Sequence, residues 1–542
     1  MIGELAADLV VIGGGLGGVA AAYTATRLGR SVVLASRFDW LGGQLTTQAV
    51  PPDEHQWIET ATTSPSYRDL RTRIREHYRG NYPLTEHARR WAELNPGLGT
   101  VSRLCHEPRV AAIVIEELLS ASIASGRLTV LRGYEPAAVC RDRDTITAVR
   151  VHRGGTELTL TAPLVADATE LGDLLPLADV PHVIGAEGVA DTGELHAPAT
   201  ADPLDQQAVT WCCALELRLG ETHTIGRPAR YAHWRDTVDP RWPGSQLSWT
   251  DIVPDLLAPR TRPIFTGAPS DAEHSGDDDL WHYRRALARR NLDRSFRGGE
   301  ITLVNWPQID YWELPLLGVD TDTHARALDG ARSQTLSLVH WMQTEAPRPD
   351  GGYGYPELRL RGDVTGTADG LAQEVYVRES RRIRALFTVT EAHIGRQMRG
   401  DIGAARFADT VGIGYYRIDL HPSTSGRTYV DIDCFPFQIP LGALIPQGAR
   451  NLLAANKNIG TTHITNGAYR LHPVEWSIGE AVGALAAFCA DNGAEPAAVH
   501  GKPALLEDFQ RLLTGTLGIT LSWPEEIRVP VACHDSIPLD VA

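Results

Sequence analysis

Cysteine is scarce in this 542-residue chain, which has seven, and no two of them form a CxxC pair. The scattered, odd-numbered set does not fit a disulfide framework and supplies no ligand group for an iron–sulfur cluster. We therefore expect reduced thiols, no metal site and a cytoplasmic location. Cys212 and Cys213 are adjacent and awkward to bridge, which favours burial over a redox pair. The other five are Cys105, Cys140, Cys434, Cys489 and Cys533.

Positive charge and long apolar runs are also missing. The formal net charge is -16, which argues against binding to nucleic acid or to anionic membranes. No run of about 18 apolar residues is free of charges and helix breakers, so no transmembrane helix is expected. The opening residues MIGELAADLVVIGGG lack the basic and apolar segments of a secretory signal. The sequence thus predicts neither a nucleic-acid nor a membrane partner.

A dinucleotide-binding unit is present near the start of the chain. Residues 8–12 (DLVVI) have the pattern of a strand buried on both faces. A glycine-rich turn, GGGLGG, follows at residues 13–18 and matches GxGxxG. Residues 19–29 then predict a helix that ends at Gly29, and residues 31–35 (SVVLA) predict a second buried strand. This order of strand, glycine turn, helix and strand predicts a dinucleotide site.

Each residue of the glycine turn has its own expected task. Gly13 permits the tight turn, Gly15 lets the backbone approach a pyrophosphate, and Gly18 lets the helix pack on the strand. The free N–H groups and the dipole at the helix start, near Leu16, favour a phosphate there. A glycine-rich turn in an unrelated α/β protein is the alternative.

The residues after the second strand favour FAD over a nicotinamide cofactor. Gly42 and Gly43 form a second glycine pair, followed by Gln44, that would let the chain pass close to the ribityl and pyrophosphate groups of FAD. The acid expected to bind the ribose hydroxyls is replaced by Ser36, whose hydroxyl can still form a hydrogen bond. Arg37 would stack on adenine or, alternatively, indicate the 2′-phosphate of NADP.

The rest of the cofactor domain is expected from distant segments. Residues 105–124 predict a helix with Pro108 in its first turn, and strand-like pieces between residues 127 and 170 are consistent with a β-meander. Asp167-Ala168-Thr169 stands where flavoproteins commonly have a strand end that crosses the dinucleotide fold. Flavoproteins commonly have glycine after such an Ala-Thr pair, but Glu170 stands here.

The C-terminal part of the cofactor domain is expected between residues 451 and 488. Residues 451–455 predict a buried strand, and residues 456–470 a turn-rich loop that contains Asn458 and Arg470. Residues 472–488 predict a helix with Pro473 at its start, whose N-terminus would point at the cofactor. Arg470 would help to stabilise the negative charge of a reduced flavin, or would form a structural salt bridge instead.

Several motifs together resemble the FAD-dependent oxidoreductase family related to glucose-inhibited division protein A and to the flavin subunit of heterodisulfide reductase. The motifs are WLGGQLT, DATELGDLLPLA, NWPQIDYW, VRESRRI, DLHPS and NLLAANKNIGTTHITNGAYRLHPVEW. The resemblance runs from residue 8 to about 490. It implies a glutathione-reductase-type FAD domain with an inserted substrate lobe, but no particular substrate.

The expected fold class is α/β, with a Rossmann-like FAD-binding domain, a β-meander and an inserted α+β substrate lobe. The length also favours more than one lobe. The FAD domain is discontinuous. It is expected to comprise residues 1–49, 105–189 and 430–495, with an insertion near the active site at 50–104, a substrate or cap lobe at 190–429 and a C-terminal tail at 496–542.

Three histidines are candidates for the base that removes a proton during substrate oxidation. His463 and His472 lie next to the expected flavin loop, and His55 lies in the insertion. The alternative for the first two is hydrogen bonding to the loop backbone, and for His55 a place in a solvated loop.

A group of arginines is the candidate for holding a substrate carboxylate. Arg378 and either Arg381 or Arg382 would share one face if VRESRRI were helical. An ion-paired face with Glu374 and Glu379 is the alternative. NWPQIDYW offers Asn305, Asp310, Tyr311 and Trp312, which suit a pocket wall and a protein core equally.

Three functions remain open. The preferred hypothesis is an oxidase or dehydrogenase that transfers hydride from a small polar organic substrate to flavin N5, with O2 or another electron acceptor. The second is a flavin monooxygenase, which needs reducing equivalents from elsewhere because no second glycine-turn unit for NAD(P)H is present. The third is a partner-dependent electron-transfer flavoprotein. The acidic charge argues against a tRNA-modifying version of it, and homo-oligomer formation is left open.

Overall fold

The computed structural model describes residues 2–60, 62–268 and 279–528. Its centre is a five-stranded parallel sheet in the order β23-β8-β2-β3-β4. Every residue of β2, β3 and β8 is buried, as expected for parallel strands covered on both faces. The α/β fold with a parallel sheet is therefore confirmed. The strands are β2 (Leu9–Ile12), β3 (Val32–Ser36), β4 (Leu128–Arg132), β8 (Leu164–Asp167) and β23 (Leu452–Ala454).

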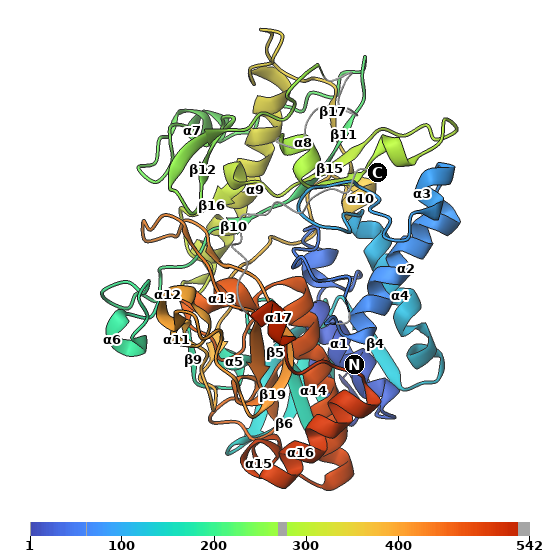
Figure 1. The fold of residues 1–542 in the computed structure, drawn as a ribbon, viewed down its shortest axis with the longest axis vertical. Coiled ribbons are helices and arrows are strands. Elements are labelled where there is room, and N and C mark those ends of the chain that lie inside the picture. Colours follow the sequence, from blue (N-terminus) through green and yellow to red (C-terminus); the bar gives the residue numbers. More distant parts are fainter. Residues whose placement is uncertain (1, 61, 269–278, 529–542) are drawn as a thin grey trace.

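Two long helices pack against each other beside this sheet in the lower half of Figure 1, α1 (Leu16–Arg27) and α14 (His472–Asn492). They approach closely because glycines and alanines line the contact. A Cβ on Gly479 would lie 2.1 Å from the carbonyl oxygen of Gly17. A Cβ on Gly483 would lie 2.3 Å from that of Ala21. The small residues of the predicted C-terminal helix thus serve helix packing.

A second sheet, in the order β1-β7-β6-β5, accompanies the parallel one. The meander is present as β5 (Glu135–Asp142), β6 (Thr145–Arg153) and β7 (Thr156–Thr161). Residues 128–132, which were assigned to the meander, form β4 in the parallel sheet instead, because Gly133, with a φ of +73°, separates them from β5. Strand β1 (Ile2–Ala6) was not expected and pairs in parallel with β7.

Residues 50–104 and the segment after α14 pack on the half that contains the parallel sheet. Helix α2 (Pro65–Asn81) lies against α4 (Pro108–Ala124), with Pro108 in the first turn as predicted. Phe509 and Trp523 of the tail are buried in the same hydrophobic core. Residues 529–542, including Cys533, lie outside the described part. The remaining helices here are α3 (Glu86–Arg90), α15 (Pro496–Gly501), α16 (Pro503–Arg511), η6 (Leu512–Thr516) and α17 (Glu525–Arg528).

The upper half of Figure 1 has a hydrophobic core of its own, built from residues between 209 and 377. An antiparallel sheet in the order β14-β15-β11-β17 and the long helix α9 (Thr321–Thr344) surround it. Trp234, Trp281 and Trp306 are buried in this core, as is Tyr311. The NWPQIDYW segment is thus largely core material. The sheet comprises β11 (Cys213–Leu217), β14 (Arg285–Leu287), β15 (Ile301–Val304) and β17 (Leu358–Leu360).

Short elements connect these parts. They are η1 (Gly43–Leu45), α5 (Leu174–Leu177), β9 (His182–Val183), α6 (Val189–Thr192), β10 (Val209–Thr210), α7 (Tyr231–Asp236), β12 (Thr250–Val253), β13 (Ala258–Thr261), α8 (Leu280–Tyr283), η3 (Arg289–Asn291), η4 (Pro307–Ile309), β16 (Asp310–Tyr311), α10 (Gly362–Thr365), β18 (Arg382–Ile383), α11 (Glu391–Ile394), α12 (Arg396–Arg399), β19 (Thr410–Gly414), β20 (Ile418–Leu420), β21 (Val430–Ile432), β22 (Phe437–Pro440), η5 (Leu441–Leu444) and α13 (His463–Tyr469). Among the described residues, no helix has the length and apolar character needed to cross a membrane.

Two further expectations about local structure were wrong. The turn-rich loop at 456–470 contains helix α13, which Thr462 caps by accepting a hydrogen bond from the backbone N–H of Thr465. The segment VRESRRI is not a helix, and only its end forms the short strand β18. Its arginines therefore do not share one helical face.

Candidate functional site

The turn between β2 and α1 leaves no room for side chains. Gly13 has a φ of +111°, and a Cβ there would lie 2.0 Å from the carbonyl oxygen of Ala168. A Cβ on Gly18 would lie 2.0 Å from the carbonyl oxygen of Gly13. At Gly15 the surroundings differ, because a Cβ would meet only side-chain ends, the nearest being Glu170 Oε1 at 2.7 Å. Gly15 is thus a residue of the turn at which the backbone faces movable side chains and not other backbone atoms. Leu16, the first residue of α1, is fully buried.

The second glycine pair is joined directly to the first turn. Gly42 has a φ of +113°, and its N–H donates to the carbonyl oxygen of Gly14 at 2.7 Å. The next residues connect the pair to the C-terminal segment. Gln44 Nε2 donates to the carbonyl oxygen of Arg470 at 2.9 Å and to the carboxylate of Glu475. The N-terminal glycine turns and the segment around Arg470 and Glu475, more than 400 residues apart in the sequence, are therefore in contact.

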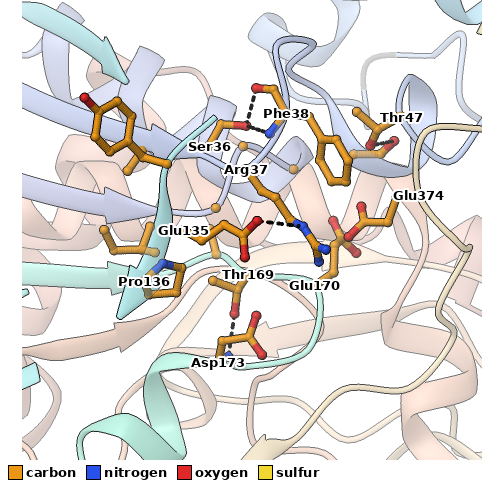
Figure 2. A pocket seen from close by; sticks show the side chains of 18 of the residues that line it. Ser36, Arg37, Phe38, Thr47, Glu135, Pro136, Thr169, Glu170, Asp173 and Glu374 are labelled. Atoms are coloured by element: carbon orange, nitrogen blue, oxygen red, sulfur yellow. Dashed lines mark hydrogen bonds and ion pairs between the residues drawn. The ribbon is translucent and has the colours of Figure 1, made fainter. Parts of the chain in front are cut away.

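A cavity lies in front of the glycine turn (Figure 2), where β2, β3 and β8 end. Ligands of parallel α/β sheets bind at this edge. The lining residues are Ile12, Gly13, Gly14, Gly15, Ala35, Ser36, Arg37, Phe38, Trp40, Gly43, Thr47, Tyr134, Glu135, Pro136, Ala168, Thr169, Glu170, Leu171, Asp173 and Glu374.

Ser36 and Arg37 line one side of this cavity. The Ser36 hydroxyl donates to the carbonyl oxygen of Phe38 at 3.0 Å and accepts from its N–H at 3.2 Å. It is therefore already engaged with the local backbone. Arg37 is half-exposed, and its Nε lies 3.3 Å from Glu135 Oε1 across the cavity mouth (Figure 2). Its guanidinium is free to turn toward a ligand because exposed ion pairs are weak.

Glu170 occupies the space in front of both glycine pairs. Its Oε1 would lie 2.7 Å from a Cβ on Gly15 and also from one on Gly43. Its other oxygen forms an ion pair with Lys457, whose side chain is 1% exposed. Asn456 Nδ2 lies 3.4 Å from Oε1. A buried lysine thus stands behind the carboxylate at the opening of the turn.

Two further glutamates near this point favour the neutral form. Burial, reinforced by Glu170, raises the pKa of Glu374 to about 8, and Gln48 donates to this carboxyl group at 3.2 Å. Burial, again reinforced by Glu170, raises the pKa of Glu475 to about 7. Glu475 accepts from the N–H of Gly17 at 3.1 Å.

The end of β8 is fixed by its own side chains and by the C-terminal loop. Asp167 is fully buried and accepts from the N–H of Thr169 at 3.0 Å, and burial raises the pKa of Asp167 to about 7. Asn458 Nδ2 donates to the carbonyl oxygen of Asp167 at 3.0 Å. Asp167 and Asn458 therefore shape the wall from behind, and neither is among the residues lining the cavity.

The cavity and its surroundings fit FAD. The glycine turn offers backbone N–H groups and the start of α1 to a pyrophosphate, and the buried Lys457 adds a positive charge. The atom nearest to a Cβ at both Gly15 and Gly43 is Oε1 of Glu170, the movable end of a side chain. Tyr134, Arg37 and Phe38 offer flat surfaces at the other end for an adenine ring.

The start of α14 contributes a buried cation. Arg470 is 3% exposed; its Nη1 donates to the hydroxyl of Tyr376 at 2.5 Å and its Nη2 to Asp419 Oδ2 at 3.0 Å. Burial, helped by nearby Arg284, lowers the pKa of His472 to about 3. His472 Nδ1 accepts from the backbone N–H of Asp53 at 3.1 Å. The ring is therefore neutral near pH 7.

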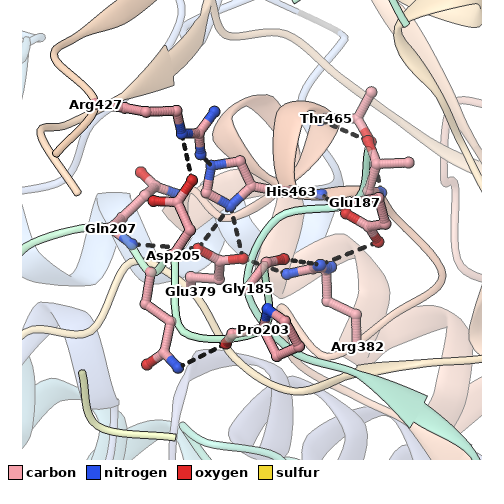
Figure 3. A network of polar contacts seen from close by, with 12 residues as sticks. Gly185, Glu187, Pro203, Asp205, Gln207, Glu379, Arg382, Arg427, His463 and Thr465 are labelled. Atoms are coloured by element: carbon pink, nitrogen blue, oxygen red, sulfur yellow. Dashed lines mark hydrogen bonds and ion pairs between the residues drawn. The ribbon is translucent and has the colours of Figure 1, made fainter. Parts of the chain in front are cut away.

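His463 lies in a separate polar network (Figure 3). Its Nδ1 is 2.9 Å from both oxygens of Glu379, and its Nε2 contacts the guanidinium of Arg427. Burial alone would raise the pKa of Glu379, but His463 and Arg382 together lower it to about 2. Both ring nitrogens are occupied, so this arrangement supports the structural alternative for His463.

His55 and Pro473 line a second, smaller cavity behind the start of α14. The ring of His55 packs against Trp57 and Trp523, at centroid distances of 6.2 and 5.2 Å. Burial, with a contribution from Arg71, lowers the pKa of His55 to about 3. His55 is thus a buried aromatic neighbour of α14 and not a solvated loop residue.

The three arginines of VRESRRI have separate ionic partners. Arg378 Nη2 pairs with Asp310 Oδ1 at 2.9 Å, and its Nη1 donates to the carbonyl oxygen of Ala208 at 2.7 Å. Arg381 Nη1 lies 3.3 Å from Asp173. Arg382 pairs with Glu379 and, at 3.0 Å, with Glu187. The ion-paired alternative is therefore the one observed, with Glu379 as a partner as expected.

Sequence reasoning missed the residues that give the cavity its charge. Lys457 sits next to Asn458, and Glu475 two residues after Pro473. Both lie in the quoted motif NLLAANKNIGTTHITNGAYRLHPVEW, but no local pattern in it indicates that they are buried beside the cavity. Glu374 was read only as a partner for arginine. Glu170 was noticed as a departure from glycine, and that departure was the signal for an ionisable group at the opening.

The match to a protein family agrees with this geometry. The model of the family described as FAD dependent oxidoreductase matches residues 8–513. A geranylgeranyl bacteriochlorophyll reductase-like protein from Thermoplasma acidophilum is similar in structure, with 10% identity, a TM-score of 0.34, and coverage of 95% of this chain and 85% of that chain. OxyS anhydrotetracycline hydroxylase from Streptomyces rimosus shows 11% identity, a TM-score of 0.32, and coverage of 95% and 67%.

A third solved structure matches only in part. L-proline dehydrogenase from P. horikoshii shows 15% identity and a TM-score of 0.18, and the match covers 35% of this chain and 26% of that chain. No curated protein matches the chain. The family match extends over nearly the whole sequence and includes the glycine turn, the wall at β8 and the helix α14. This chain belongs to the FAD-dependent oxidoreductase family, and FAD is its cofactor.

Proposed function

We propose that this protein is an oxidase or dehydrogenase that acts on a small polar organic substrate. The observation that carries the proposal is the buried polar cluster at the start of α14. Arg470 and His472 come from the C-terminal segment, Asp53 from the 50–104 insertion, and Tyr376 from the upper half of the molecule. A site formed by both halves next to the cofactor wall suits a small molecule enclosed between them.

Several residues are proposed to hold the cofactor. Gly15 would approach its pyrophosphate, with Gly13 and Gly18 shaping the turn and the helix start at Leu16 supplying its dipole. Lys457 would supply charge, and Ser36 and Arg37 would lie at the adenosine end. When bound, FAD supplies the two-electron acceptor for the substrate. Arg470, held by Tyr376 and Asp419, keeps a positive charge at the start of α14, where the helix dipole also favours negative charge.

Proton transfer is assigned to a histidine outside the original candidates. His421 Nδ1 lies 2.5 Å from Asp310 Oδ2, and its Nε2 lies 3.5 Å from Asp419 Oδ2. Asp310 orients the ring through Nδ1, and the 3.5 Å contact of Nε2 with Asp419 is long enough to give way to a substrate, unlike the close contacts on both ring nitrogens of His463. His472 is the weaker candidate for a base because its pKa is about 3. Its Nδ1 accepts from Asp53, so it would act as a hydrogen-bond donor through Nε2.

The test is anaerobic spectroscopy of the purified protein. The proposal expects the visible absorbance of oxidised flavin, its loss on adding an organic substrate, and its return in air or with another acceptor. A protein that is colourless and cannot be reconstituted with FAD contradicts the proposal. Reduction by NADPH alone would favour a monooxygenase, and reduction only with a second protein would favour an electron-transfer subunit.

The remaining expectations belong to this proposal. They are a cytoplasmic location, O2 or another small acceptor, and a relationship to glucose-inhibited division protein A and to the heterodisulfide reductase flavin subunit. The six shared motifs in the sequence support that relationship.

A further inference from the structure

Arg284 has unused hydrogen-bonding capacity in a buried place. It lies between α8 and β14 and is 8% exposed. Its ion pair with Asp53 is long, with 3.4 Å between Nη1 and Oδ1. Its Nε is buried without a partner among the described residues. A guanidinium has five N–H donors, and burying these donors without hydrogen-bond acceptors costs free energy. The natural complement is an anion that accepts two parallel hydrogen bonds.

The comparison with its neighbours makes Arg284 exceptional. The Nε atoms of Arg378 and Arg470 are also buried without a partner among the described residues, but both terminal nitrogens of Arg378 are held, by Asp310, Thr210 and the carbonyl oxygen of Ala208. Arg470 is held by Tyr376 and Asp419. The cation that the sequence offered for a substrate carboxylate, Arg378, is therefore committed elsewhere, whereas Arg284 is not.

The surroundings of Arg284 suit a small organic acid. Its guanidinium carbon lies 5.0 Å from the ring centre of Tyr283, which is only partly buried. Tyr416 interacts electrostatically with Asp53, Tyr283 and Arg470. Burial raises its pKa well above the usual value, so its hydroxyl stays protonated. These side chains offer a flat apolar face and a hydroxyl donor beside the guanidinium.

The position of Arg284 links it to the cofactor wall. The segment that contributes Gly43 and Thr47 to the cavity continues to Asp53. Asp53 contacts Arg284 with its side chain and His472, the first residue of α14, with its backbone N–H. An anion on Arg284 would therefore lie beside the start of α14.

We propose that Arg284 binds the carboxylate of the substrate, so that the protein acts on small organic acids. This inference rests on the proposed function for its location beside the flavin. The Arg284–Asp53 contact is expected to loosen when the carboxylate binds, because the guanidinium turns its two N–H edges toward the stronger bidentate partner.

The test is calorimetric titration of the FAD-loaded protein with acetate and benzoate, and with acetamide and benzamide as neutral counterparts. The carboxylates are expected to bind, and Arg284→Gln to weaken that binding by roughly tenfold or more. Arg284→Lys should bind carboxylates more tightly than Arg284→Gln but less tightly than the wild type, because lysine keeps the positive charge but cannot donate two parallel hydrogen bonds. Asp53→Asn should strengthen binding, because it removes a competing carboxylate.

Arg262→Gln is the matched control. Arg262 also lies over the Tyr283 ring, at 4.7 Å, but pairs with Asp251 at 2.8 Å. An equal loss of affinity in this variant would indicate a general charge effect and overturn the assignment. Absence of carboxylate binding to the wild type, or equal binding to Arg284→Gln, would also overturn it.

The flavin content and reducibility of each protein separate this inference from the proposed function. A yellow protein that an organic substrate reduces, but that binds no carboxylate, keeps the function and loses the anion site. Carboxylate binding that depends on Arg284, in a protein no organic substrate reduces, keeps the anion site and contradicts the function.

Discussion

At the scale of single residues, the cavity places charge where a cofactor phosphate is expected. Glu170 stands before the glycine turn and neutralises Lys457, which is almost fully buried. A dianionic pyrophosphate would compete with this carboxylate for the same lysine. Glu170 and a cofactor phosphate are thus competing partners for Lys457.

The first prediction concerns the competition between Glu170 and the cofactor phosphate for Lys457. In Glu170→Gln, Lys457 loses its carboxylate, so the apoprotein should lose about 3 kcal/mol of unfolding free energy. FAD should bind roughly tenfold more tightly, because the lysine then gains a partner only from the cofactor. Chemical denaturation and FAD titration measure the two effects. Glu135→Gln, in a half-exposed pair with Arg37, is the control. Weaker FAD binding in Glu170→Gln would instead make Glu170 a direct ligand.

The second prediction concerns pH. Glu374 and Glu475 have pKa values raised to about 8 and about 7, so both are largely neutral below pH 6. Raising the pH through these values creates negative charge beside the pyrophosphate site, so the Kd for FAD should increase by roughly tenfold between about pH 6 and pH 9. Glu374→Gln should remove the part of the increase near pH 8. A Kd independent of pH in the wild type would contradict this assignment.

At the scale of elements, the position of α14 depends on glycines. In Gly479→Ala the new Cβ would lie 2.1 Å from the carbonyl oxygen of Gly17, so α14 must move away from α1. We expect a loss of about 1–3 kcal/mol in unfolding free energy and faster loss of FAD, since α14 carries Glu475 and follows Arg470.

Gly80→Ala is the matched control for this third prediction, because Gly80 is helical and a Cβ there would have nothing within 4 Å. That variant should gain about 0.5–1 kcal/mol from the higher helix propensity of alanine. Thermal unfolding and the rate of flavin release measure both variants. Retention of wild-type stability by Gly479→Ala would show that the helix contact is adaptable.

Much of the element level was predictable, and the failures have physical causes. The unit from β2 to β3 and the helix α14 follow from strong local patterns and were found. Helix α13 was missed because its residues, HITNGAY, have low helix propensity, and tertiary burial stabilises them. VRESRRI has helical charge spacing but forms separate ion pairs with residues far away in the sequence, which no local pattern reveals.

The candidate site was predictable only where backbone geometry determines it. Gly13, Gly18 and Gly42 could be identified from the sequence because only glycine fits their turns or contacts. The importance of Arg284 depends on what does not contact it. It follows only from the comparison with Arg378 and Arg470, in which both terminal guanidinium nitrogens are held by protein groups.

At the scale of the whole molecule, buried carboxyl groups determine how stability varies with pH. Glu480 of α14 is buried beside Ser66, and burial raises its pKa to about 7. A group whose pKa is higher in the folded state stabilises fully below the unfolded value, near 4.5, and this contribution is lost as pH rises through about 7.

The fourth prediction is therefore that the unfolding free energy of the apoprotein decreases between about pH 5 and pH 8, and that Glu480→Gln makes this decrease shallower. Denaturation curves at several pH values provide the measurement. Glu76→Gln, an exposed change in α2, is the control and should leave the slope unchanged. An identical slope in Glu480→Gln would assign the pH dependence to other groups.

The close contact of Gly17 with residues of the C-terminal segment has a consequence for biosynthesis. Gly17 meets the carbonyl oxygen of Ala455, and Gly479 closes over it from α14. A nascent chain that has emerged only as far as the upper lobe has the glycine turn but not its opposite wall. Cofactor capture is therefore expected to wait until more than 400 residues after the glycine turn have been synthesised. During that interval the incomplete sheet lacks its edge strand β23.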